Sequence, residues 1–136
     1  MVIVDDHLAL LALAGRLPEL GLGPVATTYC FHYRIARAVS DSRRSGTLSR
    51  RLADPKAALE RVMRPPADRL VVLDPRQSLH RAVAVADTER ANLLLAELVG
   101  AAVHHGAAVR VTPENTGRGW PQIMAGAGVD FGNVMI

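Results

Sequence analysis

The sequence predicts an α/β domain in which helices cover both faces of a mainly parallel sheet. Short apolar, β-branched runs recur along the chain, helix-like segments lie between them, and Gly or Pro residues mark the changes from one to the other. Strands that alternate with helices favour parallel pairing, and such a sheet is buried on both faces. The length of 136 residues is typical of a single domain, which we take to span residues 1–136.

Four apolar runs have the composition of buried strands. They are residues 2–4, 70–73, 108–111 and 129–134. In an open parallel sheet, functional groups gather beyond the carboxyl ends of the strands. Polar residues that directly follow these runs are therefore the first candidates for a site.

The helices are predicted from capping residues, stop residues and apolar spacing. Thr27-Thr28 caps one helix, Asp54-Pro55 and Asp74-Pro75 open two others, and Gly15 and Gly106 end two more. The predicted ranges are 8–14, 29–39, 55–63, a helix after 75, 87–105 and 121–125. His104 and His105 then lie in the last turn of the longest helix, where a cationic side chain suits the helix dipole.

Composition excludes several classes of protein. No apolar run approaches the roughly 18 residues that span a bilayer, and the N-terminus has Asp5 and Asp6 in place of a basic leader, so we expect a cytoplasmic protein without a membrane. Cys30 is the single cysteine, which leaves no disulfide framework or cysteine zinc cluster, and we interpret it as a buried side chain rather than a reactive thiol. The net charge is +3, and nearly all of the positively charged residues are arginines. Such a charge permits a nucleic-acid partner.

Four segments in order resemble the PIN domains, and among them the VapC toxins. They are Val2-Ile3-Val4-Asp5-Asp6 before a helix, Pro24-Val25-Ala26-Thr27-Thr28 before the next, Leu73-Asp74-Pro75, and His104-His105-Gly106 followed by the strand and turn Val109-Arg110-Val111-Thr112-Pro113-Glu114-Asn115. The resemblance covers nearly the whole chain. It implies a PIN-like three-layer α/β/α fold with a central, mainly parallel sheet.

The resemblance also implies a function. VapC proteins are metal-dependent endoribonucleases that a cognate antitoxin, encoded beside them, holds inactive. Three or four carboxylates at strand and helix ends bind Mg²⁺ or Mn²⁺, hard cations that prefer oxygen ligands. The metal ions activate a water molecule and offset charge that develops on the phosphate.

Asp5 matches the first family acid, because it ends the first strand. It is either a metal ligand or a simple cap for the following helix, and Asp6 could equally supply that cap. The second family acid is missing, since Arg34 occupies its place beside His32 and Tyr33. An arginine repels a metal ion, but it could pair with Asp5 or contact an RNA phosphate.

The other two acids have displaced candidates. For the third, Asn92 has suitable surroundings and Glu97 lies among apolar residues, where an unpaired carboxylate is costly to bury, so we favour Glu97. Asp87 and Glu89 are better explained by the electrostatics of a helix N-terminus. Glu114 or Asn115 meets the fourth position, although the turn that contains them needs no function to explain it.

We therefore predict a VapC-like ribonuclease toxin with two overlapping sets of residues. The catalytic set is Asp5, Arg34, Glu97 and Glu114, and the metal set is Asp5, Asp6, Glu97 and Glu114. The RNA-binding candidates are Arg43, Arg44, Arg50 and Arg51, which could equally form a solvated face. Trp120 could stack on a base or plug the end of the sheet.

Partners follow from the same resemblance. An antitoxin would cover the site through a helix in a groove or an arginine among the acids, and the apolar helices are compatible with a homodimer. The rival hypothesis is a catalytically inactive PIN-like domain that binds protein or RNA. Converging carboxylates with room for an ion would favour the enzyme, and an ion pair between Asp5 and Arg34 would favour the binding module.

Overall fold

Five short strands form one parallel sheet in the computed structural model, which describes residues 1–41, 46–50 and 52–136. The strands are β1 (Val2–Val4), β2 (Val25–Thr27), β3 (Val71–Val72), β4 (Ala108–Val111) and β5 (Phe131–Asn133). Their order across the sheet is β3-β2-β1-β4-β5, and every neighbouring pair is parallel. The predicted α/β class is confirmed.

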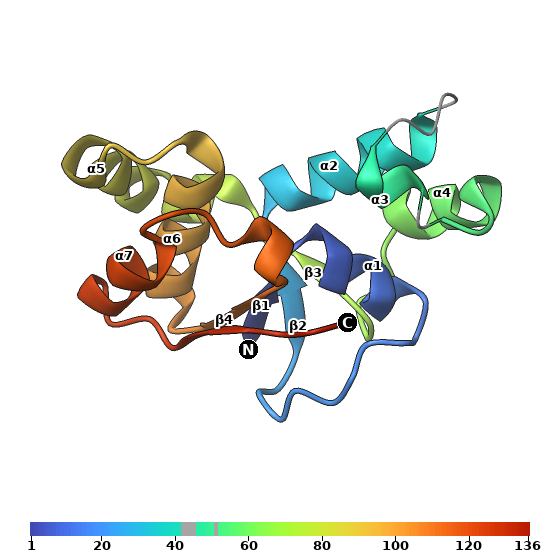
Figure 1. Ribbon diagram of the computed structural model, residues 1–136, viewed down its shortest axis with the longest axis horizontal. Coiled ribbons are helices and arrows are strands. Elements are labelled where there is room, and N and C mark those ends of the chain that lie inside the picture. Colours follow the sequence, from blue (N-terminus) through green and yellow to red (C-terminus); the bar gives the residue numbers. More distant parts are fainter. Residues whose placement is uncertain (42–45, 51) are drawn as a thin grey trace.

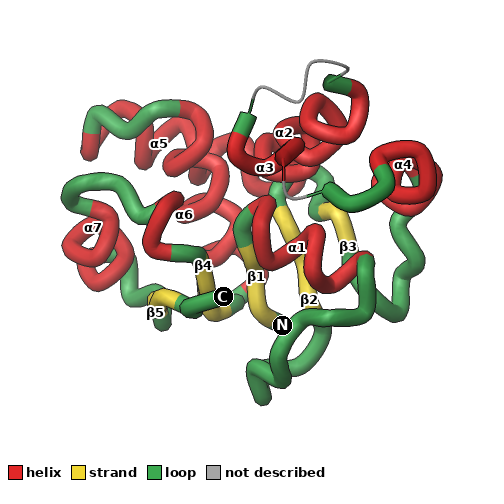
Figure 2. Tube along the Cα trace, turned by 45° about the vertical axis from the view of Figure 1, so that its right-hand side comes forward, coloured by secondary structure: helices red, strands yellow, loops and turns green. Residues whose placement is uncertain are grey.

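Helices cover both faces of this sheet (Figures 1 and 2). They are α1 (Asp6–Leu13), α2 (Tyr29–Ser40), α3 (Thr47–Arg50), α4 (Pro55–Met63), α5 (Leu79–Glu89), α6 (Leu93–His105) and α7 (Trp120–Gly126), with short 3₁₀ turns η1 (Pro75–Ser78) and η2 (Pro113–Asn115). This is the three-layer α/β/α arrangement expected of a PIN-like fold. Within the described ranges, no helix has both the length and the apolar character needed to cross a membrane.

The side chains of β1 alternate between two hydrophobic cores, as the period of a strand requires. Ile3 packs in a core with α6 and α7, whereas Val2 and Val4 pack in a second core with α1, α3 and α4. Helix α2 contributes to both, since Phe31 lies in the first core and Ile35 in the second. Helix α2 is therefore anchored on both sides of the sheet.

The structure differs from the prediction at one strand and one helix. Strand β2 is not predicted by pattern, because only three residues separate Pro24 from the helix cap at Thr28. The single helix predicted over 87–105 is wrong, since the chain takes a left-handed conformation at Arg90 (φ 52°) and Asn92 caps a new helix. This break allows α5 to turn back and pack against α6.

The break also changes the interpretation of three candidates. Asp87 and Glu89 lie at the C-terminal end of α5 and not at a helix N-terminus, which corrects the electrostatic explanation given for them. The side chain of Asn92 accepts a hydrogen bond from the backbone N–H of Leu95 (3.0 Å), so Asn92 acts as a helix cap.

The strand order places a topological switch point between β1 and β4. From β1 the chain builds outward to β2 and β3, then returns to lay β4 on the other side of β1. Ligand sites of open parallel sheets lie in the crevice at such a point, beyond the carboxyl ends of the two strands. Asp5 and Thr112 directly follow β1 and β4.

Candidate functional site

Five polar residues meet at the carboxyl ends of β1 and β4, and we call this cluster the switch-point site. They are Asp5, Asp6, Arg34, Thr112 and Asn115. Asp5, Asp6 and Thr112 are almost completely buried, while 43% of the Arg34 side chain is exposed. The cluster is therefore a mainly internal polar network with one side open to solvent through Arg34.

The Asp5 carboxylate accepts four hydrogen bonds. The backbone N–H of Leu8 donates to Oδ1 (2.9 Å), and Oδ2 accepts from the backbone N–H of Thr112 (2.7 Å), the Thr112 hydroxyl (2.7 Å) and Nδ2 of Asn115 (2.8 Å). A carboxylate offers about four acceptor positions. Asp5 thus caps α1 and ties β1 to the end of β4, with its acceptor capacity in use.

Asp6 faces the guanidinium of Arg34. Nε of Arg34 lies 3.0 Å from Oδ2 of Asp6, although the two groups are not aligned for a hydrogen bond and Oδ2 has none. Oδ1 accepts from the backbone N–H of His7 (2.9 Å) and from Nδ2 of Asn115 (2.6 Å). The pKa of Asp6 lies above its ordinary value of 3.8 because burial raises it; Arg34 opposes this rise and the neighbouring Asp5 adds to it.

Asn115 joins the charged groups. Its Nδ2 donates to both aspartates, and its Oδ1 accepts from Nη2 of Arg34 (3.3 Å). An amide suits this place because it presents donors to anions and an acceptor to a cation. Of the two residues considered for the fourth family position, the structure brings Asn115 into contact with Asp5.

Glu114 and His7 lie at the edge of the site. Nε2 of His7 is 3.7 Å from Oε2 of Glu114 and 4.0 Å from Oδ1 of Asp6. His7 is buried and its Nδ1 has no partner, whereas nearly half of the Glu114 side chain is exposed. Glu114 therefore faces His7 at the rim of the site.

Glu97 is buried on α6 and binds the start of α2. Its Oε1 accepts from the backbone N–H of Cys30 (2.8 Å), within the first turn of α2, where Thr28 caps the helix. An anion there satisfies an unpaired N–H and interacts well with the helix dipole. Burial, and then the nearby Glu97, raises the pKa of the Cys30 thiol to about 11, so this cysteine is protonated at neutral pH.

The predicted RNA-binding residues are only partly placed. Arg43, Arg44 and Arg51 lie outside the described residues. Arg50 ends α3 and is exposed, and its Nε donates to the backbone oxygen of Gly46 (3.4 Å). Trp120 is buried in the core with α6, which agrees with a plug and not with an exposed stacking surface.

The contacts of these residues do not fit Mg²⁺ or Mn²⁺. Asp5 has its acceptor positions in use, Asp6 faces a guanidinium, and Glu97 is bonded to α2. In the part of the chain that the structure describes, no three His, Cys, Asp or Glu side chains are grouped as metal ligands. The expected gap between carboxylates contains Arg34, paired with Asp6 instead of Asp5.

Sequence reasoning missed two participants, Thr112 and His7. Thr112 directly follows a predicted strand, and a polar residue at that position is a candidate for the site. His7 directly follows two acids, and nothing in its local sequence pattern indicates that it is buried. The sequence matches no protein-family model and no curated protein. The likeness to PIN domains therefore depends on the four motifs and on the strand arrangement.

Proposed function

We propose that this chain is a catalytically inactive PIN-like domain that acts in the cytoplasm as a binding module for a protein partner. The observation that carries this proposal is the guanidinium of Arg34, 3.0 Å from the Asp6 carboxylate. A positive charge already occupies the place where the metal-dependent mechanism needs a cation, and the Asp5 carboxylate is used for structure.

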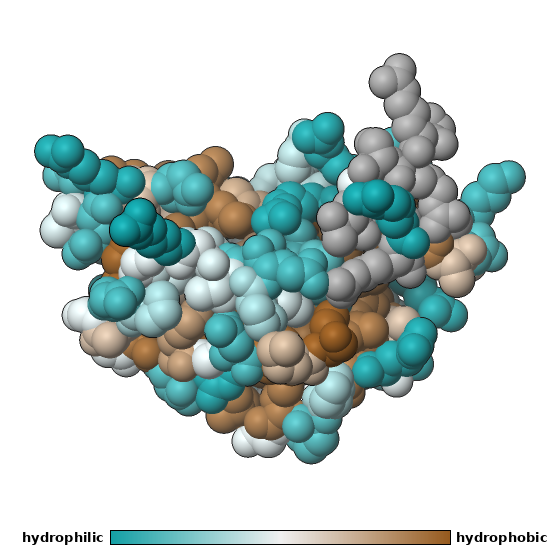
Figure 3. All heavy atoms as spheres, in the orientation of Figure 1, coloured by the Kyte–Doolittle hydropathy of each residue, from teal (hydrophilic) through white to brown (hydrophobic). Residues whose placement is uncertain are grey.

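A groove beside the site supports a protein partner. Its volume is about 290 Å³, and we call it the α1–α4 groove because these helices provide most of its walls. Its apolar lining includes Leu10, Leu11, Leu48, Leu52 and Ile136. Figure 3 shows apolar side chains gathered around the C-terminal end of the chain, close to α1. Such a groove suits the apolar face of an amphipathic helix.

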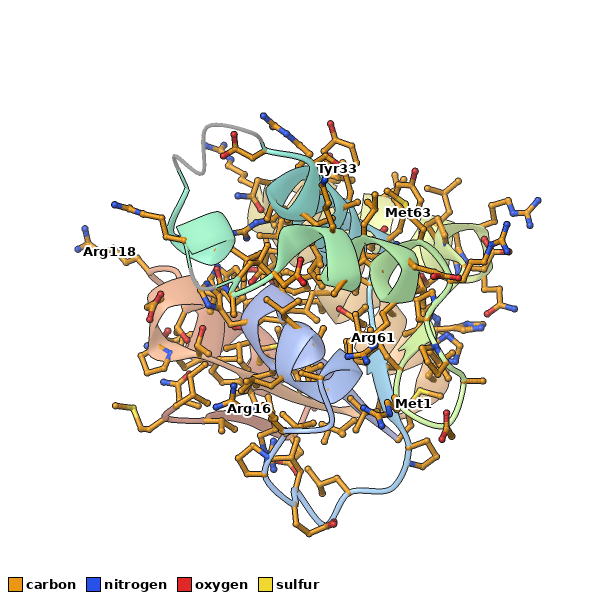
Figure 4. All side chains as sticks on the ribbon, turned by 90° about the vertical axis from the view of Figure 1, so that its right-hand side faces the viewer. Met1, Arg16, Tyr33, Arg61, Met63 and Arg118 are labelled. Carbon is orange, nitrogen blue, oxygen red and sulfur yellow. The ribbon has the colours of Figure 1, made fainter. Side chains whose placement is uncertain are left out.

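Charge at the groove indicates the character of that helix. Arg16 and Arg61 line the groove with Asp54, and Figure 4 shows both arginines close to α1. Nδ1 of His7, another lining residue, is buried without a partner. We expect a helix with acidic residues beside its apolar face, supplied by an antitoxin-like protein encoded beside this chain.

Two matched variants test the binding surface. Ala57 lines the groove and is exposed in the first turn of α4, where a glutamate suits the helix, so Ala57→Glu is expected to fold normally. Ala84→Glu places the same charge on the exposed surface of α5, outside the groove. In co-purification with the protein encoded beside this chain, the Ala57→Glu variant should lose the partner and the Ala84→Glu variant should retain it. Equal retention of the partner by both variants would contradict the proposal that the α1–α4 groove binds it.

The second candidate is the VapC-like endoribonuclease. It is favoured by the convergence of Asp5 and Asp6 at the switch point, with Glu114 close to His7. Cleavage of total RNA with Mg²⁺ or Mn²⁺, lost in Asp5→Ala, would establish this enzyme and refute the inactive module. The absence of cleavage by a well-folded protein is the expected result.

A further inference from the structure

Helix α5 presents apolar side chains to solvent at the outer edge of the molecule (Figure 1). Leu79 and Val83 are 57% and 60% exposed, and the half-buried Ala86 is the next residue on the same face of the helix. Ala82, which is buried, instead faces α6 beside Gly100. Apolar residues grouped on one helical face, unlike scattered ones, indicate a contact surface.

The charged side chains of α5 oppose the dipole of their own helix. The first turn contains His80 and Arg81 and no acid, whereas the last turn contains Asp87 and Glu89 and no base. Acids are favourable near a helix N-terminus and cations near a C-terminus, so each group lies at the less favourable end. None of these four exposed side chains has a hydrogen bond or an ion pair with another residue that the structure describes. Contacts within one chain therefore do not account for this distribution.

A second copy of α5, packed antiparallel about a two-fold axis near Val83, accounts for both features. In an antiparallel pair, residues at nearly equal distances from the axis lie opposite each other. Val83 then meets Val83 of the second copy, and Leu79 lies next to Ala86 of the second copy. The imidazole N–H of His80 lies opposite the carboxylate of Asp87 of the second copy, and the symmetry repeats this contact. The acidic last turn of each helix also lies beside the positive dipole end of the other.

We propose that this chain forms a homodimer through α5, in which Leu79 and Val83 are buried and reciprocal contacts between His80 and Asp87 set the antiparallel orientation. The inference goes beyond the proposed function and does not depend on it, since no residue of α5 lines the α1–α4 groove. One face of an 11-residue helix is small for a protein interface. The dimer is therefore weak, with a dissociation constant on the order of 10–100 µM.

Sedimentation equilibrium between about 5 µM and about 500 µM protein tests the association. The average mass of wild type should rise from 14.6 kDa toward twice that value. Val83→Glu places a charge at the centre of the contact and should stay monomeric, and it should fold because the position is exposed and glutamate favours a helix. Thr88→Glu adds the same charge about 140° around the helix and should associate like wild type. A wild type that stays monomeric, or equal association by the two variants, would overturn the inference.

Two charge changes test the antiparallel orientation. His80→Glu places acids opposite each other, and Asp87→Lys removes the acceptor of His80, so each change should weaken association about tenfold. Both changes suit the helix dipole, and both variants are therefore expected to remain folded. The double variant, and an equal mixture of the two single variants, should associate again because a glutamate then faces a lysine. If neither recovers while circular dichroism shows folded proteins, the inference is overturned. The partner test of the groove is unaffected by this outcome.

Discussion

Replacing Thr112 by valine removes one hydrogen bond from Asp5 and leaves the shape of the side chain almost unchanged. The hydroxyl lies 2.7 Å from Oδ2 of Asp5, and both residues are essentially inaccessible to solvent. A hydrogen bond to a charged group contributes about 1.5–3 kcal/mol, and burial prevents water from replacing it. For a chain of 136 residues, this loss lowers the melting temperature by about 5–10 °C.

Urea denaturation followed by circular dichroism measures the free energy of unfolding directly. Thr88→Val is the matched control, because Thr88 is exposed on α5 and its substitution should change stability by less than about 0.5 kcal/mol. A Thr112→Val protein as stable as wild type would refute the reasoning. It would mean that the Asp5 carboxylate does not depend on the donors at the end of β4.

Three further predictions concern buried polar groups and packing. Burial raises the pKa of Asp6, so the folded state binds the proton more tightly than the unfolded state, and stability falls as pH rises from about 3.8 through the raised pKa. In Asp6→Asn, this part of the fall in unfolding free energy between pH 3 and pH 7 should be absent. Glu97→Leu leaves the N–H of Cys30 without its acceptor and should cost about 1–3 kcal/mol in urea denaturation, whereas Glu97→Gln should cost less. Gly100→Ala places a Cβ atom 2.8 Å from the backbone nitrogen of Ala82, and overpacking should lower unfolding free energy by about 1–3 kcal/mol.

Each of these predictions has a result that contradicts it. An Asp6→Asn protein with the same pH dependence as wild type would show that Asp6 keeps an ordinary pKa. Equal stabilities of Glu97→Leu and Glu97→Gln would remove the helix-capping role of Glu97. A Gly100→Ala protein that gains stability would mean that α5 can move away from α6 at little cost.

Several parts of the fold could be predicted because they depend on neighbouring residues. Thr28 and Asp54 cap helices as their positions predict, and Gly106 ends α6 in the left-handed conformation. The strand at 108–111 agrees with the predicted range. The break at Arg90 could not be predicted in this way, since its flanking residues favour a continuous helix and the packing of α5 on α6 decides against it.

The sequence by itself determined the α/β class, the position of Asp5 after the first strand, and the presence of Arg34 where the resemblance to PIN domains implies an acid. Only the tertiary structure decided what these groups contact. Asp5 binds Thr112, 107 residues away, because β1 and β4 are paired in parallel and end at the same edge. Arg34 meets Asp6 and not Asp5, since the carboxylate of Asp5 is turned toward the donors of α1 and β4. Such partners depend on strand register and helix placement, which no local pattern specifies.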